Sequence, residues 1–309
     1  MIELQEITID KKDMLDYYLK FYCVASSEFT FTNLFMWRKS YNIKYAIIND
    51  LLCFFPQHQS GPHSTTFPIG DTSNADNVRN TISEILNYFK EIGEPTIIRL
   101  CSNEAVDLLH KLFPNQFNVA EDVDSFDYVY NTSELISLTG KKFHQKRNHI
   151  NKFKSLYDFE YRKITAENLG DCVELFERWY GSFDTRGIDV SEGEEAFKEF
   201  AANFEQLDVR GGGIYVDNKL VAFSFGEPLC AHTVVIHFEV ADTEYQGAFP
   251  MINQQFLENE WSHFEFVNRE EDMGLEGLRR AKRSYNPVRM TKKFVATLRT
   301  EATGSMNIY

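Results

Sequence analysis

Two titratable residues, His237 and Glu239, alternate with apolar residues in the segment 233–240. Strict alternation predicts a central strand that carries both side chains on one face. Transfer of an acyl group to an amine requires a base that takes the proton of the acceptor. We expect Glu239 to be this base. His237 is the second candidate for the base, and we expect it to lie beside the substrate. The structural alternatives are an ion pair for Glu239 and a hydrogen-bonded core position for His237.

The next segment, 245–251, has the composition of a phosphate-binding turn. Gly247 and Ala248 let backbone N–H groups approach a ligand closely, and Pro250 suits the first turn of a helix. A strand, a small-residue loop and a helix N-terminus in succession can hold a pyrophosphate, with a plain tight turn as the alternative. The donor-binding residues expected here are Val240, Gln246, Gly247, Ala248, Phe249, Pro250 and Met251.

Three more charged residues, Arg269, Glu270 and Asp272, follow a strand predicted at 264–268. Charged groups crowded at the end of a strand are costly to bury unless they are paired. We expect these residues to hold the acceptor substrate or, alternatively, one another.

Positive charge is concentrated in two segments of a chain whose net charge is -14. Segment 141–154 contains six Lys or Arg residues, segment 277–300 contains eight, and neither contains an acidic residue. Local cations on an acidic body favour phosphate recognition, although a basic helix that faces acidic neighbours is the alternative. The residues expected to contact the phosphates of a small donor are Lys282, Arg283 and Ser284. The residues expected to contact a larger ligand, on the basic helix, are Lys142, Lys146 and Arg147.

Short helices and strands alternate along both halves of the chain, which predicts an α+β fold. With 309 residues the chain exceeds the usual size of one hydrophobic core, so two domains are expected. The spacing of Phe143, Ile150, Phe153 and Tyr157 predicts one helix between the halves. The expected domains are 1–140, the connecting basic helix 141–157, and 158–309 with the donor site.

The order strand, Gly-containing loop, helix, strand, helix, strand in the second half resembles the Gcn5-related N-acetyltransferase (GNAT) superfamily. Its usual Q/R-x-x-G-x-G/A pattern is altered, because Glu244 stands at the first position and Phe249 at the last. Two longer segments, 141–153 and 268–287, look like the signatures of a bacterial family. That family is similar to the C-terminal domain of phosphatidylglycerol lysyltransferases and, more distantly, to the Fem-type peptidoglycan ligases.

This resemblance implies two tandem GNAT-like domains, each a mixed and mostly antiparallel sheet flanked by helices. It implies coenzyme A as the cofactor, with acyl-CoA as the donor. The alternative donor is the aminoacyl-tRNA that the lysyltransferase and Fem relatives use. Acetyltransferases often place a tyrosine acid in the helix that here ends before Pro287. The resemblance therefore makes Tyr285 the proton donor, with core packing as the alternative.

The leading expectation is an acyltransferase that moves an acyl group from acyl-CoA to an amine or hydroxyl by direct attack. The acceptor is a small or lipid-like molecule. The alternatives are aminoacyl transfer from tRNA and a non-catalytic binding or regulatory module.

For cellular location and metal binding, the sequence offers only the absence of certain patterns. No apolar stretch is long enough to span a bilayer and the first residues lack the features of a signal peptide, so a cytoplasmic protein is expected. The five cysteines are scattered and form no CxxC pair, which indicates neither a disulfide framework nor a metal site. The sequence leaves the oligomeric state open.

Overall fold

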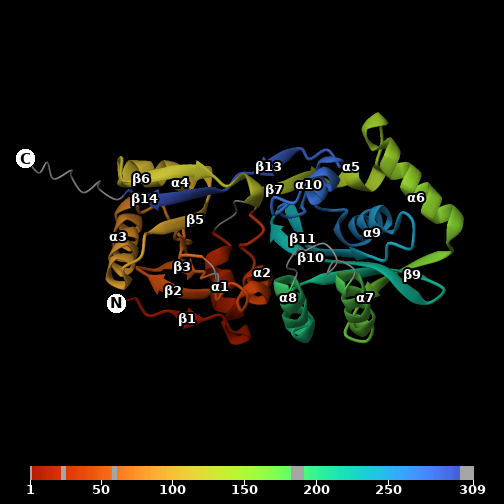
Figure 1. The fold of residues 1–309 in the computed structure, drawn as a ribbon, viewed down its shortest axis with the longest axis horizontal. Coiled ribbons are helices and arrows are strands. Elements are labelled where there is room, and N and C mark those ends of the chain that lie inside the picture. The colour runs from red at the N-terminus through yellow and green to blue at the C-terminus, as the bar shows by residue number, and fades with distance from the viewer. Residues whose placement is uncertain (1, 22–25, 58–60, 182–190, 300–309) are drawn as a thin grey trace, which may run out of the picture. The chain divides into compact units, whose positions relative to one another are not determined.

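The computed structural model of the chain describes residues 2–21, 26–57, 61–181 and 191–299 (Figure 1). The chain forms two compact units whose segments interleave along the sequence. The segments of the first unit are 1–6, 44–123 and 292–309, and those of the second are 7–43 and 124–291. Among the described residues, no helix combines the length and the apolar character required to cross a bilayer.

The described residues of the first unit form two sheets and two α-helices. An antiparallel sheet consists of β1 (Gln5–Glu6), β2 (Lys44–Ile48) and β3 (Leu51–Phe55). The other sheet has the order β4 (Thr65–Thr66), β5 (Ile97–Cys101), β14 (Phe294–Leu298) and β6 (Phe117–Glu121). The helices are α3 (Ala75–Ile92) and α4 (Asn103–Leu112). α3 begins where the side chain of Asn74 accepts two backbone N–H groups and ends at Gly93, which is left-handed, and its apolar face is buried.

The second unit is built on one seven-stranded sheet. Its order is β13 (Arg289–Thr291), β7 (Asp127–Asn131), β12 (Phe266–Asn268), β11 (Thr233–Ala241), β10 (Lys219–Cys230), β9 (Arg210–Val216) and β8 (Phe159–Ile164). The strands β11 and β12 are parallel, and the other neighbours are antiparallel.

Helices and short turns surround this sheet. The described helices are α1 (Lys12–Leu19), α2 (Phe31–Trp37), α5 (Thr132–Ser137), α6 (His144–Leu156), α7 (Leu169–Gly181), α8 (Ser191–Ala202), α9 (Ala248–Phe256) and α10 (Glu276–Arg283). A π-helix (Leu257–Trp261) continues α9, and 3-10 helices cover Ile9–Lys11, Val123–Ser125, Lys141–Phe143 and Phe204–Gln206. The helix expected over 141–157 is thus a 3-10 turn followed by α6.

The seven-stranded sheet is covered on both faces (Figure 1). On one face, Phe176 of α7 and Phe197 of α8 pack on Phe238 of β11, with ring centroids 6.3 and 5.0 Å apart. On the other face, Phe153 of α6 and Met251 of α9 belong to a core that includes residues of the sheet. We call these faces the α8 face and the α9 face.

The two units repeat one strand topology. In each unit a parallel pair, β4 and β5 or β11 and β12, is linked by a helix, α3 or α9. Next to the pair lies a strand from a distant part of the chain, β14 or β7, and then β6 or β13. The expected α+β class of mixed, mostly antiparallel sheets flanked by helices is confirmed. The units differ from the consecutive domains expected at 1–140 and 158–309, because β7 and β14 each pair within the sheet formed mainly by the other half.

Candidate functional site

β11 carries a β-bulge at His237. Phe238 pairs with Phe225 of β10, whereas Ile236 pairs with the next residue, Gly226, so His237 is an extra residue in its strand. A Cβ atom at Gly226 would overlap the backbone of β11, which explains a glycine opposite the bulge. The bulge breaks the alternation of side chains along the strand.

His237 and Glu239 therefore lie on opposite faces of the sheet, and the expectation that they share a face is wrong. Ile236 lies in the core of the α9 face, whereas Phe238 packs on the α8 face. Beyond the bulge, Glu239 accepts a hydrogen bond from Asn253 of α9. The two candidate bases thus belong to two separate sites.

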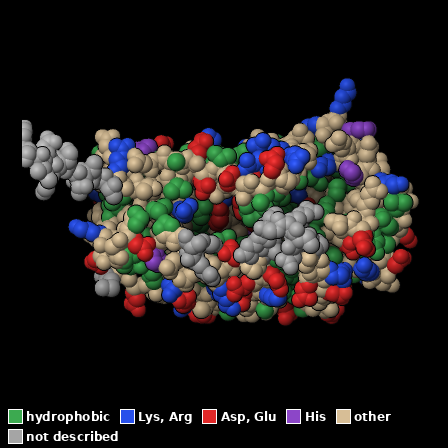
Figure 2. All heavy atoms as spheres, in the orientation of Figure 1, with side chains coloured by type: hydrophobic (Ala, Val, Ile, Leu, Met, Phe, Trp, Pro, Cys, Tyr) green, Lys and Arg blue, Asp and Glu red, His purple; other side chains and the backbone are tan. Residues whose placement is uncertain are grey.

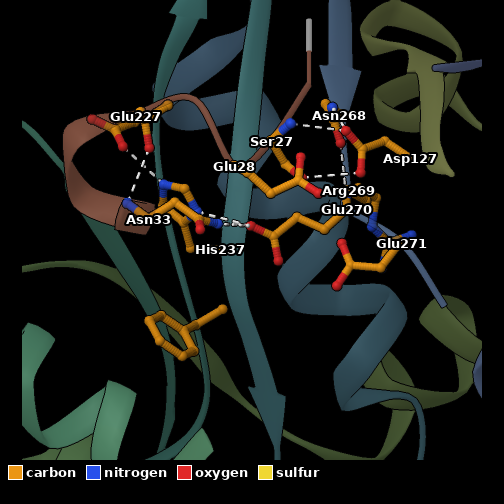
Figure 3. Close-up of polar contacts among 12 residues, drawn as sticks. Ser27, Glu28, Asn33, Asp127, Glu227, His237, Asn268, Arg269, Glu270 and Glu271 are labelled. Carbon is orange, nitrogen blue, oxygen red and sulfur yellow. Dashed lines mark hydrogen bonds and ion pairs between the residues drawn. The ribbon is translucent and has the colours of Figure 1, made fainter. Parts of the chain in front are cut away.

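The imidazole of His237 is buried between two glutamates on the α8 face (Figure 3). Its Nε2 lies 2.9 Å from Glu227 Oε1, and its Nδ1 lies 2.9 Å from Glu270 Oε1. Nδ2 of Asn33, from α2, lies 3.4 Å from the same oxygen of Glu270. Burial alone would lower the pKa of His237, but its bonds to Glu227 and Glu270 raise the pKa to about 9. His237 is protonated at neutral pH, which makes it a poor base.

Further carboxylates lie near Glu270 (Figure 3). Asp127 is buried, and its oxygens accept hydrogen bonds from the backbone N and Oγ of Ser27 at 2.8 and 2.9 Å and from Nδ2 of Asn268 at 2.9 Å. The Oγ of Ser27 also lies 3.5 Å from Glu28 Oε2. The name acidic cluster is used below for Glu28, Asp127, Glu227, His237, Glu270 and Glu271.

Most members of this cluster were missed in the sequence. Glu28 and Asn33 lie on segments far from β11 in the chain, and no local pattern connects them with His237. Asp127 offered a signal, because a carboxylate within the otherwise apolar run 126–130 must be paired when the strand is buried.

Lys282 holds the turn that follows β12. Its buried Nζ donates to the backbone carbonyl oxygens of Arg269, at 2.5 Å, and Glu271. Burial lowers the pKa of this lysine. In the same turn Glu270 has a left-handed φ of 58°, a conformation that costs free energy unless its surroundings fix it. Lys282 therefore positions Arg269 and Glu270, and the contact with donor phosphates that we expected of it stays a prediction.

Asp272 is also structural. Its oxygens accept hydrogen bonds from Arg279 at 2.8 and 2.9 Å, from the hydroxyl of Tyr128 at 2.5 Å and from the N–H of Gly274 at 3.0 Å. These bonds, first those from Arg279, hold the pKa of Asp272 at about 2. The carboxylate thus stabilises its own loop, and the acceptor-binding role that we expected of it stays a prediction.

Arg269 and Glu239 form an ion pair on the α9 face. Nη2 of Arg269 lies 2.7 Å from Glu239 Oε1, and Glu239 Oε2 accepts from Nδ2 of Asn253 at 2.9 Å. The guanidinium carbon lies 4.7 Å from the ring centre of Tyr285 and 5.7 Å from that of Tyr130. Both carboxylate oxygens of Glu239 therefore accept hydrogen bonds. This arrangement is the ion pair that was the structural alternative to a catalytic base.

Lys146 enters the same place from α6. Its Nζ lies 3.8 Å from the ring centre of Tyr285. Burial and the charge of Arg269 lower the pKa of Lys146 to about 8, against the opposing effect of Glu239. Burial raises the pKa of Tyr285 well above its ordinary value, although Arg269 opposes it, so the phenol keeps its proton at neutral pH. The name Arg269 site is used below for Tyr130, Lys146, Glu239, Arg269 and Tyr285.

The loop expected to bind a pyrophosphate lies against α6. Gly247 precedes α9 with a φ of 93°, and a Cβ atom there would overlap the backbone carbonyl of His149 and contact Phe153. The backbone of α6 thus closes the loop on the side of Gly247. Of the other residues expected to bind the donor, Val240, Ala248 and Met251 are buried, Phe249 and Pro250 are half-buried, and Gln246, Arg283 and Ser284 are exposed.

The three expected contacts on the basic helix have different surroundings. Lys142 pairs with a carboxylate of α5 at 2.8 Å, and Arg147 donates to backbone carbonyls of the preceding turn. Lys146 points into the Arg269 site. Other cations of α6, such as Lys152 and Lys154, are exposed, and Figure 2 shows Lys, Arg and His side chains along α6 and over α10.

The sequence matches the family described as phosphatidylglycerol lysyltransferase, C-terminal, over residues 20–297. It is similar to a solved structure of a conserved protein of unknown function from Bacteroides thetaiotaomicron, at 32% identity and a TM-score of 0.87, over 97% of this chain and 100% of that one. The fold is also similar to that of L-PGS from Bacillus licheniformis, at 14% identity and a TM-score of 0.64, over 97% of this chain and 94% of that one.

A curated relative is an uncharacterised protein of Mycoplasmoides gallisepticum, which is 23% identical over 173 residues. This match covers 55% of the chain and 56% of the relative. The family match confirms the resemblance seen in segments 141–153 and 268–287, together with the GNAT-like fold that it implied.

Proposed function

Since the chain belongs to the family of phosphatidylglycerol lysyltransferase C-terminal domains, we propose that it transfers an aminoacyl group from a carrier ester to an acceptor hydroxyl or amine. The description of the family names lysyl transfer. A lysyl group is positively charged, and the structure contains a negatively charged site, the acidic cluster. This proposal replaces acyl-CoA with an aminoacyl ester as the leading donor.

The acidic cluster is the observation that carries this proposal (Figure 3). It contains five carboxylates, and His237 and Lys282 lie among them. Carboxylates in a partly buried place are suited to bind a further cation. The ammonium group of an aminoacyl donor would supply that cation, with Glu270 as its expected partner because this side chain is the more exposed of the two that bind His237.

The Arg269 site supplies groups suited to the proton transfers. In the proposed reaction the acceptor oxygen or nitrogen attacks the ester carbonyl carbon, Glu239 takes the acceptor proton, and the bond to the carrier oxygen breaks. Tyr285 then gives its proton to that oxygen. Each engaged oxygen of Glu239 retains a second lone pair for this purpose.

The phenol of Tyr285, which burial keeps protonated, is suited to an ester donor. An alcohol is a much weaker acid than a thiol, so a leaving alkoxide needs a proton donor, whereas coenzyme A can leave as a thiolate. The contact between Gly247 and α6 also speaks against a pyrophosphate at this loop.

The exposed cations of α6 support a polyanionic carrier such as tRNA. Lys152 and Lys154 lie in a segment without acidic residues and face solvent. Cations of this kind bind nucleic acid phosphates with an affinity that falls as salt rises.

The test is a transfer assay with the full chain, radiolabelled lysyl-tRNA and vesicles that contain phosphatidylglycerol. We expect label to move into the organic phase, and we expect Glu270→Gln to lower that rate at least about tenfold because the ammonium loses its partner. The matched control is Glu265→Gln, an exposed glutamate just before β12.

Two results would change the assignment. Release of coenzyme A from acetyl-CoA in the presence of an amine, without consumption of lysyl-tRNA, would restore the acyl-CoA donor. Binding of either donor without turnover by the wild-type chain would favour the non-catalytic module.

A further inference from the structure

The Arg269 site contains more positive charge than its ion pair uses. Arg269 binds Glu239 through Nη2, but its Nη1 is buried and lacks a hydrogen-bond partner among the described residues. A buried guanidinium N–H group without an acceptor is expensive in free energy. Such a donor indicates either a defect of the packing or a ligand that supplies the acceptor.

A second cation lies at the same ring. The Nζ of Lys146 lies 3.8 Å from the ring centre of Tyr285, and the guanidinium carbon of Arg269 lies 4.7 Å from the same point. The distance between the two cationic groups therefore cannot exceed the sum of these two distances. Lys146 forms no ion pair among the described residues and is half-buried. Burial and the neighbouring Arg269 lower its pKa to about 8, as expected for a cation whose charge is not compensated.

The acidic cluster does not compensate this charge. His237 and Glu270 lie on the α8 face, whereas Lys146 and Arg269 lie on the α9 face with Glu239 as the carboxylate in contact. The site thus holds two cations beside one carboxylate, and its excess of positive charge favours an anionic ligand.

We propose that Lys146 Nζ and Arg269 Nη1 together bind the phosphate group of a small phosphate ester. The two donors come from separate elements, α6 and the turn after β12, and a tetrahedral phosphate offers each of them an oxygen of its own. The aromatic rings of Tyr130 and Tyr285 lie beside the guanidinium group of Arg269. This phosphate site is independent of the proposed transfer, because it would bind phosphate even if the protein catalysed no transfer.

Calorimetric titration of the full chain tests the proposal with inorganic phosphate, glycerol 3-phosphate and adenosine 5′-monophosphate as probes. We expect saturable binding that weakens at least about tenfold in Lys146→Met and is partly restored in Lys146→Arg. The control Lys198→Met, at an exposed position on α8, should bind like the wild type. Tighter binding of the nucleotide or of the glycerol ester would identify the source of the phosphate and support the site.

A second readout separates binding from a merely structural role. An anion beside Lys146 raises its pKa, so binding at pH 8 should take up protons and the heat should depend on the ionisation enthalpy of the buffer. This dependence should vanish in Lys146→Met.

The proposal would be overturned if folded wild-type protein showed no saturable binding at millimolar phosphate ester, or if Lys146→Met bound as tightly as the wild type. Equal affinity for acetate would overturn the assignment to phosphate. None of these measurements requires turnover, so they are independent of the transfer assay.

Discussion

Arg269 and Glu270 are consecutive residues that serve opposite faces of one sheet. The guanidinium of Arg269 binds Glu239 on the α9 face, and the carboxylate of Glu270 binds His237 on the α8 face. The turn that carries both is fixed by the bonds of Lys282 to its carbonyl oxygens. The two side chains thus extend from adjacent Cα atoms, about 3.8 Å apart, toward different faces of the sheet.

His237→Gln should change how stability depends on pH. The pKa of His237 is raised to about 9, so its contribution to stability is complete below about pH 6.5 and is lost as pH rises through 9. We expect the variant to be less stable than the wild type by up to about 3 kcal/mol at pH 6, with a gap that narrows by pH 10. Urea unfolding of both proteins at the two pH values measures this gap. A gap that stays constant would show that the imidazole is not protonated between its two glutamates.

Gly247→Ala should destabilise the second unit. A residue at a φ of 93° is strained if it has a Cβ atom, and that atom would also meet the backbone of α6. We expect a loss of about 1–3 kcal/mol in the free energy of unfolding. Gly277→Ala is the control, since a Cβ there meets nothing within 4 Å and the residue lies in α10. If both variants unfold at the same urea concentration, α6 does not close this loop.

Tyr285→Phe should lower aminoacyl transfer without loss of donor binding. Removal of a general acid typically costs about 100-fold or more in turnover, and the ring that contacts Lys146 and Arg269 is kept. The transfer assay and filter retention of the donor measure the two quantities separately. Wild-type turnover in this variant would leave Tyr285 with a packing role.

The double change Lys152→Glu, Lys154→Glu should weaken tRNA binding and reduce its salt dependence. Each lost phosphate contact flattens the slope of log affinity against log salt by about one unit. Filter binding between low and moderate salt measures this slope. Lys198→Glu, an exposed position on α8, is the control and should leave the slope unchanged. Two equal slopes would exclude the exposed side of α6 as the contact surface.

Local patterns in the sequence predicted the elements better than the sites. The spacing of apolar residues located α6, and alternation located β11, because each pattern reflects burial along a single element. Alternation failed at His237, since a bulge depends on the register with β10 and Gly226, which lies 11 residues earlier in the chain. Pairings such as Asn33 with Glu270 join distant segments and leave no local signal.

The pairing of β14 between β5 and β6 affects the order of events during synthesis. A ribosome makes β5 and β6 first, then the whole segment 124–291 of the second unit, and only afterwards the strand that completes the first sheet. Until then, the edges of β5 and β6 that β14 will cover present unpaired backbone groups, which are templates for aggregation. The first sheet therefore stays incomplete until residues 294–298 have been made, after the segments of the second unit.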